Sequence, residues 1–237
     1  MPTIMLVNSN NRGVAVAYHL MQLCDSALPV GGFSFSCAVE SAAAQGLLLS
    51  NHDVEQYARV VVRQTLLNDG VAALHALRHG DSIAELCRAD RELLSRKISL
   101  EMRTMSCRMG RKLAELGSEI LPCHDIGEWL SCIVGHRTVG SYAVTQGLIF
   151  SLCGAAEQDL FAAVGYGAAS MVLSASLRMV RVTHRDTQKI LFSLAPFVES
   201  LYDEVCALGL EQMYGFAPQM DILSSLHERG TQRMFMS

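Results

Sequence analysis

Two long stretches without a charged residue constrain the fold of this 237-residue chain more than any other feature. Residues 138–156 and 160–177 contain no Asp, Glu, Lys or Arg, and three residues separate them. A membrane-spanning helix needs about 20 predominantly apolar residues, so both stretches approach that length. They contain as much Ala, Gly, Ser and Thr as Leu, Ile and Val, and they lack aromatic belts and Lys/Arg-rich flanks. We therefore expect two buried helices of a globular bundle, with an integral membrane protein as the alternative.

Composition narrows the class of protein further. Half of the residues are hydrophobic and 18% are charged, which supplies a large core and excludes a disordered chain or a disulfide mini-scaffold. The 19 basic and 23 acidic residues give a net charge of −4. Nucleic-acid binders normally carry a basic stripe and a high pI, so we expect no nucleic-acid partner. A mean hydropathy of +0.25 is high for a chain of this charge.

The cysteines and the amino terminus indicate the compartment. The eight cysteines include no CxxC pair, so neither a zinc site nor a redox motif is supported. Residues 1–13 are polar, are expected to be flexible and contain no apolar segment of the secretory type. We expect a reducing cytoplasm, in which free cysteines behave as small buried hydrophobes.

The clearest helical pattern covers residues 95–116. Apolar side chains such as Met102 and Met109 recur there every three or four residues, which is the period of an amphipathic helix. Ser106 and Gly110, four residues apart, leave a shallow side on which another backbone could approach closely. We therefore expect this helix to be central to the packing.

Cap signals and breaks predict the remaining helices. Ser34 and Ser36 are candidate N-caps of one helix that Gly46 would end in the left-handed conformation. Ser50 and Asp53 have the spacing of a capping box. No alternating strand pattern, repeat or linker is present, so residues 1–237 are predicted to form one all-α domain, a bundle of about ten helices. Further helices are expected over residues 15–24, 125–136, 186–208 and 221–230.

Motifs for catalysis are not found. The sequence contains no GxxxxGK[ST], HExxH, GxSxG or GxGxxG, so the chain is not expected to hydrolyse a nucleotide by itself. His75 with His79, and Cys132 with His136, are four residues apart and could share a helix face as metal ligands. Either pair supplies two ligands where a zinc site usually needs three or four. We expect each pair to be either solvent-exposed or packed in the core, and a helical metal-binding protein or enzyme using these His and Cys side chains remains the alternative.

Three segments, taken together and in order, resemble the urease accessory protein UreF family. Residues 20–33 contain D-S-x-L-P-x-G-G-F, and residues 99–113 match the central S-x-E-x-R-x-x-S-x-x-x-G-R-x-L helix of that family. Residues 221–237 are similar to its carboxy-terminal segment, which finishes close to R-L-F-R-S. The resemblance extends over about residues 20–237.

The chain departs from the family pattern at two places. Where the pattern continues H-S-G-G-L-E, this chain has Phe35 in place of His and Cys37 and Ala38 in place of the two glycines, before Glu40. Met236 stands where an Arg is usual. We expect these changes to leave the fold intact.

The resemblance implies an all-α, non-enzymatic protein of the cytoplasm that needs no cofactor and holds no metal of its own. Members of the family are urease-maturation chaperones that join the accessory protein UreD, also called UreH, and the GTPase UreG on apo-urease. That complex inserts nickel into the urease active site. The family member bridges the other two proteins, regulates GTP hydrolysis by UreG and forms homodimers.

Partner-binding hypotheses follow from this resemblance. The segment 210–237 is expected to dock on UreD through apolar anchors and charged flanks, since aromatic and Arg side chains are common energetic centres of interfaces. The loop after the first helix either contacts a partner or only joins two helices, and Arg178 either caps its helix or faces the GTPase. The candidate partner-binding residues are His227, Arg229, Arg233, Met234, Phe235, Asp25, Ser26, Pro29, Gly31, Gly32 and Arg178.

Other motif residues are expected to act in packing. They lie at the start of the second predicted helix and along the central one. These structural candidates are Glu40, Glu101, Arg103, Ser106 and Gly110.

Overall fold

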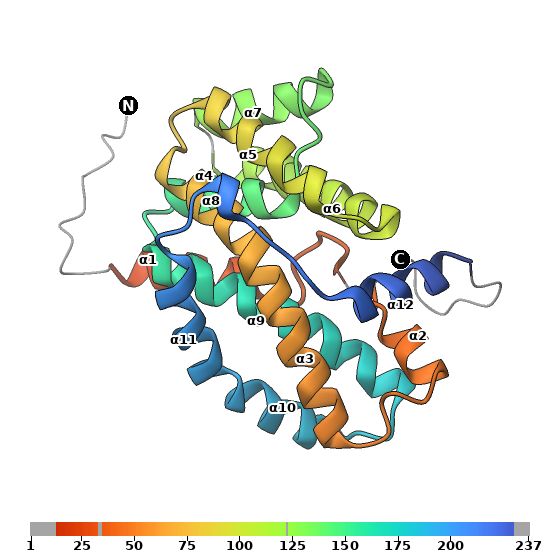
Figure 1. The fold of residues 1–237 in the computed structure, drawn as a ribbon. Coiled ribbons are helices and arrows are strands. Elements are labelled where there is room, and N and C mark those ends of the chain that lie inside the picture. Colours follow the sequence, from red (N-terminus) through yellow and green to blue (C-terminus); the bar gives the residue numbers. More distant parts are fainter. Residues whose placement is uncertain (1–12, 33–34, 122, 230–237) are drawn as a thin grey trace.

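A computed structural model describes residues 13–32, 35–121 and 123–229, and this part of the chain forms helices and no strand (Figure 1). The predicted all-α bundle is confirmed. The helices are α1 (Val14–Cys24), α2 (Val39–Ala44), α3 (Asn51–Thr65), α4 (Val71–Arg78), α5 (Ile83–Arg96), α6 (Leu100–Ile120), α7 (His124–Val134), α8 (Tyr142–Leu152), α9 (Glu157–Met179), α10 (His184–Ser193), α11 (Ala195–Val205) and α12 (Pro218–Arg229). All but one of residues 1–13 lie outside the described part, so their predicted flexibility remains a prediction.

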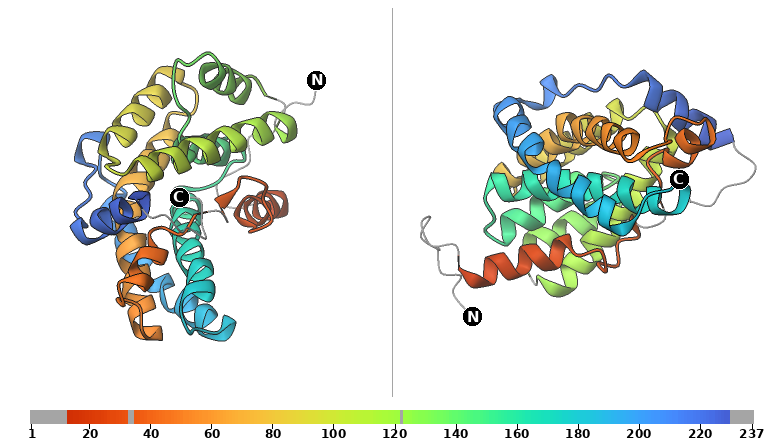
Figure 2. Two further views of the ribbon diagram at one scale, coloured as in Figure 1. Left: turned by 90° about the vertical axis from the view of Figure 1, so that its right-hand side faces the viewer. Right: turned by 90° about the horizontal axis from the view of Figure 1, so that it is seen from below.

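The two uncharged stretches form α8 and α9, and both lie in the interior. α9 packs against α2, α3, α10 and α11, and α8 lies between α4 and α6 (Figures 1 and 2). α9 is long and apolar enough to cross a membrane, but 61% of its most apolar window is buried within the bundle. Eight of the 11 residues of α8 are buried. Packing therefore accounts for the apolar character of both helices, as predicted.

Missing side chains let α8 approach its neighbours closely. A Cβ on Gly110 of α6 would overlap the carbonyl oxygen of Gly140, and one on Gly147 would overlap that of Ala73. Beside Gly110, the hydroxyl of Ser106 accepts a 3.3 Å hydrogen bond from the amide of Tyr142. The predicted shallow side of the central helix is confirmed, and its occupant is the backbone entering α8.

A buried carboxylate also holds the backbone that enters α8. Asp90 of α5 is fully buried and accepts hydrogen bonds from the amides of Gly140 (2.9 Å) and Ser141 (2.7 Å) and from the hydroxyl of Thr138. Donors around a helix start stabilise an anion, because unpaired amides and the helix dipole are positive there. No sequence pattern indicated this contact.

One pair of helices is joined by a π-helical segment. Leu66–Gly70 connects α3 to α4 without a break in helical backbone conformation. A π segment is equivalent to one extra residue in an α-helix, so it changes which face the following residues present. Helix α3 packs on α9, and α4 packs mainly on α8.

Several helix boundaries differ from those predicted. α2 begins only after Ala38, and the buried hydroxyl of Ser36 has no hydrogen-bond partner within the described residues, so Ser36 is not its N-cap. Ser34 lies outside the described residues. The predicted left-handed Gly46 (φ +69°) and the capping box of Ser50 with Asp53 are confirmed.

Three longer segments were divided or shifted by local signals. The predicted helix 95–116 begins only at Leu100, because the Ser99 side chain accepts from the Met102 amide and caps it. The expected single helix 186–208 is two, since Pro196 opens a new helix directly after Leu194. The last helix starts at Pro218, three residues earlier than predicted.

Candidate functional site

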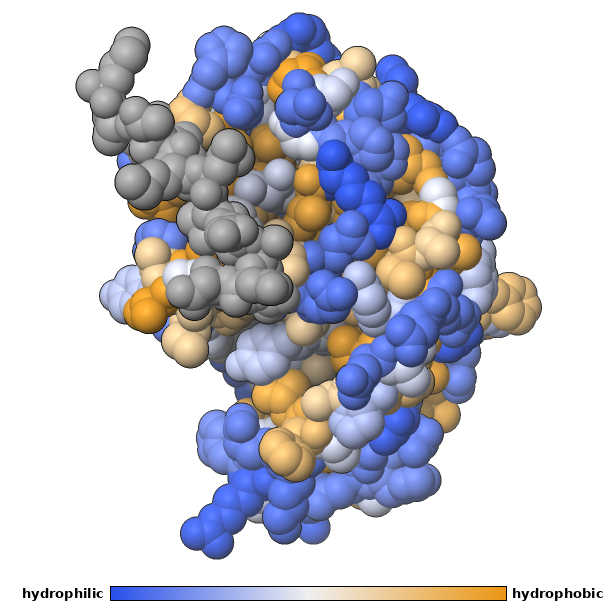
Figure 3. Space-filling model, turned by 90° about the vertical axis from the view of Figure 1, so that its left-hand side faces the viewer, coloured by the Kyte–Doolittle hydropathy of each residue, from blue (hydrophilic) through white to orange (hydrophobic). Residues whose placement is uncertain are grey.

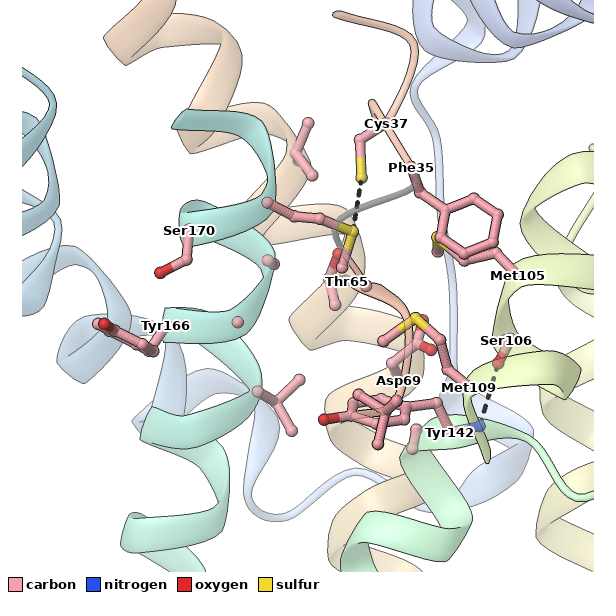
Figure 4. A pocket seen from close by; sticks show the side chains of 18 of the residues that line it. Phe35, Cys37, Thr65, Asp69, Met105, Ser106, Met109, Tyr142, Tyr166 and Ser170 are labelled. Atoms are coloured by element: carbon pink, nitrogen blue, oxygen red, sulfur yellow. Dashed lines mark hydrogen bonds between the residues drawn. The ribbon is translucent and has the colours of Figure 1, made fainter. Parts of the chain in front are cut away.

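A cavity of about 220 Å³ lies between α1, α3, α6 and α9, beside the loop that joins α1 to α2 (Figure 4). Its lining includes Asp25, Ser26 and Gly32 from the first motif segment and Ser106 from the second. Ser224 of α12, from the third segment, also lines it, so the structure brings all three segments together around one mostly apolar space.

The third segment joins them through a buried acid–base cluster. His227 of α12 has only 4% of its side chain exposed. Its Nε2 lies 2.9 Å from a carboxylate oxygen of Glu40 on α2, and its Nδ1 lies 3.1 Å from one of Glu101 on α6. We call these residues the Glu40–His227–Glu101 cluster. It links the second and third motif segments to Glu40, which follows the first segment.

The His227 ring is enclosed between the two carboxylates, with each ring nitrogen within hydrogen-bond distance of one of them. A buried charge whose partner is removed typically costs about 3–5 kcal/mol. The cluster is therefore suited to hold α12 in one position against α2 and α6, in agreement with the predicted packing role of Glu40 and Glu101. The partner contact predicted for His227 remains a prediction, and no sequence pattern linked this residue to the two carboxylates.

A second buried ion pair lines the cavity. Nζ of Lys97 lies 2.7 Å from a carboxylate oxygen of Asp69, and only 8% of the lysine side chain is exposed. Arg103 donates a 2.7 Å hydrogen bond to the carbonyl of Lys97. Arg103 thus supports the link between α5 and α6, which agrees with its predicted packing role.

The backbone before α2 is in an unusual conformation. Cys37 (φ +49°) and Ala38 (φ +59°) both lie in the left-handed region, at the two positions where the family pattern has glycine. The hydroxyl of Tyr57 donates a 2.7 Å hydrogen bond to the Cys37 carbonyl, and burial raises the pKa of Tyr57, so it remains a donor. Burial also raises the pKa of the Cys37 thiol to about 11. The thiol is therefore protonated at neutral pH.

The first motif segment has the features of a connecting loop. The Asp25 carboxylate accepts a 2.8 Å hydrogen bond from the amide of Ala27, which forms a turn directly after α1. Gly31 has φ +83°, a conformation that favours glycine. These contacts support the joining role of the segment. Partner contact by this segment remains a prediction for all five candidates, Asp25, Ser26, Pro29, Gly31 and Gly32.

The structure describes Arg178 but not residues 230–237 of the carboxy-terminal tail. Arg178 lies in the last turn of α9, where a cation interacts favourably with the helix dipole, and it also lines the cavity. The side chain of Arg229, at the end of α12, lies outside the described residues, as do Arg233, Met234 and Phe235. Their predicted partner contacts therefore remain predictions.

The histidine and cysteine pairs have structural explanations. The rings of His75 and His79 stack at 4.2 Å, with His75 Nε2 2.9 Å from Glu85 and His79 Nδ1 3.0 Å from a backbone carbonyl. Burial lowers the pKa of His75 and favours its neutral form. Cys132 is buried in α7, whereas His136 lies beyond the end of that helix with φ +57°, so this pair does not share a helix face. Among the described residues, no group of three or more His, Cys, Asp or Glu is arranged to hold a metal ion.

The fold and this site place the protein in a class of all-α proteins. Its sequence motifs contact one another through close packing and buried ion pairs. The sequence profile of the UreF family matches residues 48–195. The chain belongs to this family of urease accessory proteins, and its membership supports a role in urease maturation.

Similarity to individual proteins extends along nearly the whole chain. It is 39% identical over 237 residues to urease accessory protein UreF 2 of Brucella canis, covering 99% of this chain and 98% of that protein. It is 38% identical to urease accessory protein UreF of Photorhabdus laumondii, covering 91% of this chain and 96% of that protein. The corresponding protein of Yersinia enterocolitica is 35% identical over the same shares.

Proposed function

We propose that this protein is a non-enzymatic scaffold of the cytoplasm that bridges UreD and the GTPase UreG on apo-urease during nickel insertion, and that it regulates GTP hydrolysis by UreG. Membership of the UreF family is the starting point. The absence of a phosphate-binding loop from the sequence is consistent with assigning the nucleotide chemistry to a partner.

The observation that carries the docking part of the proposal is the two-sided character of α12. Its inner face buries Leu223 and His227, and the latter is held by the Glu40–His227–Glu101 cluster. Its outer face exposes Ile222 and Leu226, one turn apart, with exposed fractions of 61% and 46%. Apolar side chains on a fixed helix provide a preorganised contact surface, which lowers the entropic cost of binding.

UreD is the partner assigned to this outer face, in continuity with the carboxy-terminal segment 210–237. Figure 1 shows α12 beside α2 at one end of the bundle, away from the α7 end. Helix α12 leads directly into the residues that contain Arg233, Met234 and Phe235. The helix and the tail together would form one docking surface.

A homodimer is also part of the proposal. Helix α1 lies at the edge of the bundle in both views of Figure 2, and it exposes Val14, Tyr18 and Met21 at helical spacing. On the face drawn in Figure 3, apolar patches alternate with hydrophilic areas and form no continuous belt. Such separate patches fit several protein contacts better than immersion in a bilayer.

The docking surface can be tested by charge insertion. Replacing Ile222 and Leu226 together by Asp is expected to abolish capture by UreD, because two carboxylates would be buried in the interface without partners. The matched control is Phe192→Asp on α10, which is 85% exposed and is expected to leave capture unchanged. Undiminished capture of the α12 variant would contradict the assignment.

The overall role is tested in cells. Co-expression of a urease gene cluster with this chain is expected to give active urease and to co-purify UreG, whereas omission of the chain should abolish both. Deletion of residues 230–237 should also reduce urease activity, because it too would weaken capture by UreD. Full urease activity without the chain would refute the proposed function.

A further inference from the structure

Sulfur atoms are concentrated around the cavity described above. Two cysteines and five methionines are among its lining residues, and they come from five different parts of the chain. They are Cys24, Cys37, Met102, Met105, Met109, Met171 and Met220. Figure 4 shows Cys37, Met105 and Met109 pointing toward the same space.

Two of these sulfurs already face each other. The Cys37 thiol donates to the thioether of Met171 with 3.5 Å between the sulfur atoms, and this contact is the dashed line from Cys37 in Figure 4. With metal–sulfur bonds of about 2.3 Å, an ion held by two sulfurs at this separation would have a sulfur–metal–sulfur angle of roughly 100°. That angle leaves room for one or two additional methionine ligands.

We propose that Cys37 and Met171 bind a soft monovalent metal ion of the Cu(I) class inside this cavity, at a site independent of the role in urease maturation proposed above. Thiolate and thioether ligands select soft ions of this kind, whereas Mg²⁺ and Ca²⁺ prefer oxygen. The carboxylate of Asp69, which also lines the cavity, is already paired with Lys97.

The charge balance favours a monovalent ion. Binding forms a metal–thiolate bond and releases the thiol proton to solvent, with no change of oxidation state. The bound ion and the Cys37 thiolate together are neutral, so no net charge is added to a mostly apolar space. A divalent ion with the same two ligands would leave one uncompensated charge, which a low-dielectric site disfavours.

Two observations indicate that the site is a feature of this chain and is not common to all proteins of this fold. Cys37 stands where the family pattern has glycine, and a glycine would supply no thiol. Cys37 and Ala38 both hold left-handed backbone conformations that non-glycine residues rarely adopt. Backbone strain of this kind is often associated with functional positions.

The cavity is also accessible to an ion. Part of its lining is exposed, namely Ser26 in the loop after α1 and Tyr166 on α9. The ion can therefore enter without unfolding of the bundle.

The test is a competition titration of the purified full-length protein. Cu(I) held by the chelator bicinchoninic acid under anaerobic conditions is transferred to the protein at pH 7. We expect the wild type to take one equivalent tightly. Met171→Leu, which keeps the side-chain volume, should weaken this equivalent at least tenfold, and Cys37→Ser should abolish it.

Matched controls separate the cavity from the other sulfurs. Cys206→Ser and Met213→Leu lie outside the cavity lining and should leave the tight equivalent unchanged. Cys37→Gly restores the residue of the family pattern and relieves the left-handed conformation. It provides a folded variant without the thiol if Cys37→Ser folds poorly. Circular dichroism verifies the fold of each variant.

The pH dependence gives a second readout. A thiol must lose its proton to bind a metal ion, and an ordinary thiol is mostly protonated from pH 6 to 8, so binding releases one proton over this range. The affinity should therefore rise about tenfold for each pH unit. Wild-type affinity in Met171→Leu, an equal loss in Cys206→Ser, or a flat pH profile would each overturn the proposal.

Discussion

Helix α6 holds two neighbours by two different physical means. In its middle, Ser106 and Gly110 receive the backbone that enters α8, a contact of shape in which the missing side chain is essential. At its first turn, the carboxylate of Glu101 holds α12 through the buried ring of His227, a contact of charge. The core helix is thus fixed by close packing, whereas the peripheral helix is fixed by a few buried ionic groups. Only the second contact can be broken without disturbing the core.

The largest effect is expected for the contact of charge. His227→Ala leaves the carboxylates of Glu40 and Glu101 buried together without the histidine ring that contacts both, at a cost of about 3–5 kcal/mol in the free energy that holds α12. Hydrogen exchange should show faster exchange of the α12 amides, with α8 and α9 unchanged. The control His52→Ala alters an exposed histidine and should change the stability by less than about 0.5 kcal/mol. Uniformly faster exchange would show that the two contacts are not separate.

Disrupting the contact of shape between α6 and the backbone entering α8 should lower the stability of the whole protein. Gly110→Ala places a methyl group against the carbonyl of Gly140, and backbone cannot move aside as a side chain does. We expect a loss of about 2–3 kcal/mol in urea unfolding. Gly167→Ala on α9 meets nothing within 4 Å and should instead stabilise the protein by about 0.5–1 kcal/mol. Equal effects of the two alanines would refute the role of close approach.

A smaller change tests the polar part of the same contact. Ser106→Ala removes the acceptor of the Tyr142 amide, and an unpaired buried amide costs about 1–2 kcal/mol. The loss should be nearly absent when the variant is compared in the Gly110→Ala background, because the backbone is already displaced there. A double-mutant cycle by chemical unfolding measures this coupling.

The smallest effect is expected next to Glu40. Ala38→Gly relieves a left-handed conformation that costs an L-residue roughly 1–2 kcal/mol, but it also frees the unfolded chain. The expected result is a stabilisation of about 0.5–1 kcal/mol, read from the melting temperature. A destabilised Ala38→Gly would show that the buried methyl group contributes more than the backbone strain costs.

Most of the fold could be predicted from the sequence, because the signals that begin and end its helices are local. The capping box of Ser50 with Asp53, the left-handed Gly46 and the small residues Ser106 and Gly110 all have their predicted roles. The errors arose where two local signals competed. Pro196 opens a new helix within an otherwise continuous periodic segment, and Ser99 caps a helix that periodicity alone extended backward.

The candidate site could be predicted only in part, because its contacts join residues that are far apart in the chain. Glu40 and Glu101 were singled out as motif residues and His227 as a partner contact, yet nothing in their spacing showed that they meet. Asp90 carried no motif at all, and its partners lie about 50 positions further on. The facing sulfurs of Cys37 and Met171 are likewise separated by 134 positions. Such pairings are set by the packing of whole helices.

The π-helical segment between α3 and α4 couples chain length to helix register. It holds one residue more than an α-helix of the same angular span, so deleting one residue of Leu66–Gly70 would convert the segment to ordinary α-helix and leave Val71, Ala72 and Leu74 in their buried positions. Each residue of a regular α-helix turns by about 100°, so the same deletion within α3 would rotate every following residue by that angle relative to the core. Along an evolutionary path, the π-helical segment is therefore the part of this continuous helix in which a single-codon deletion is best tolerated.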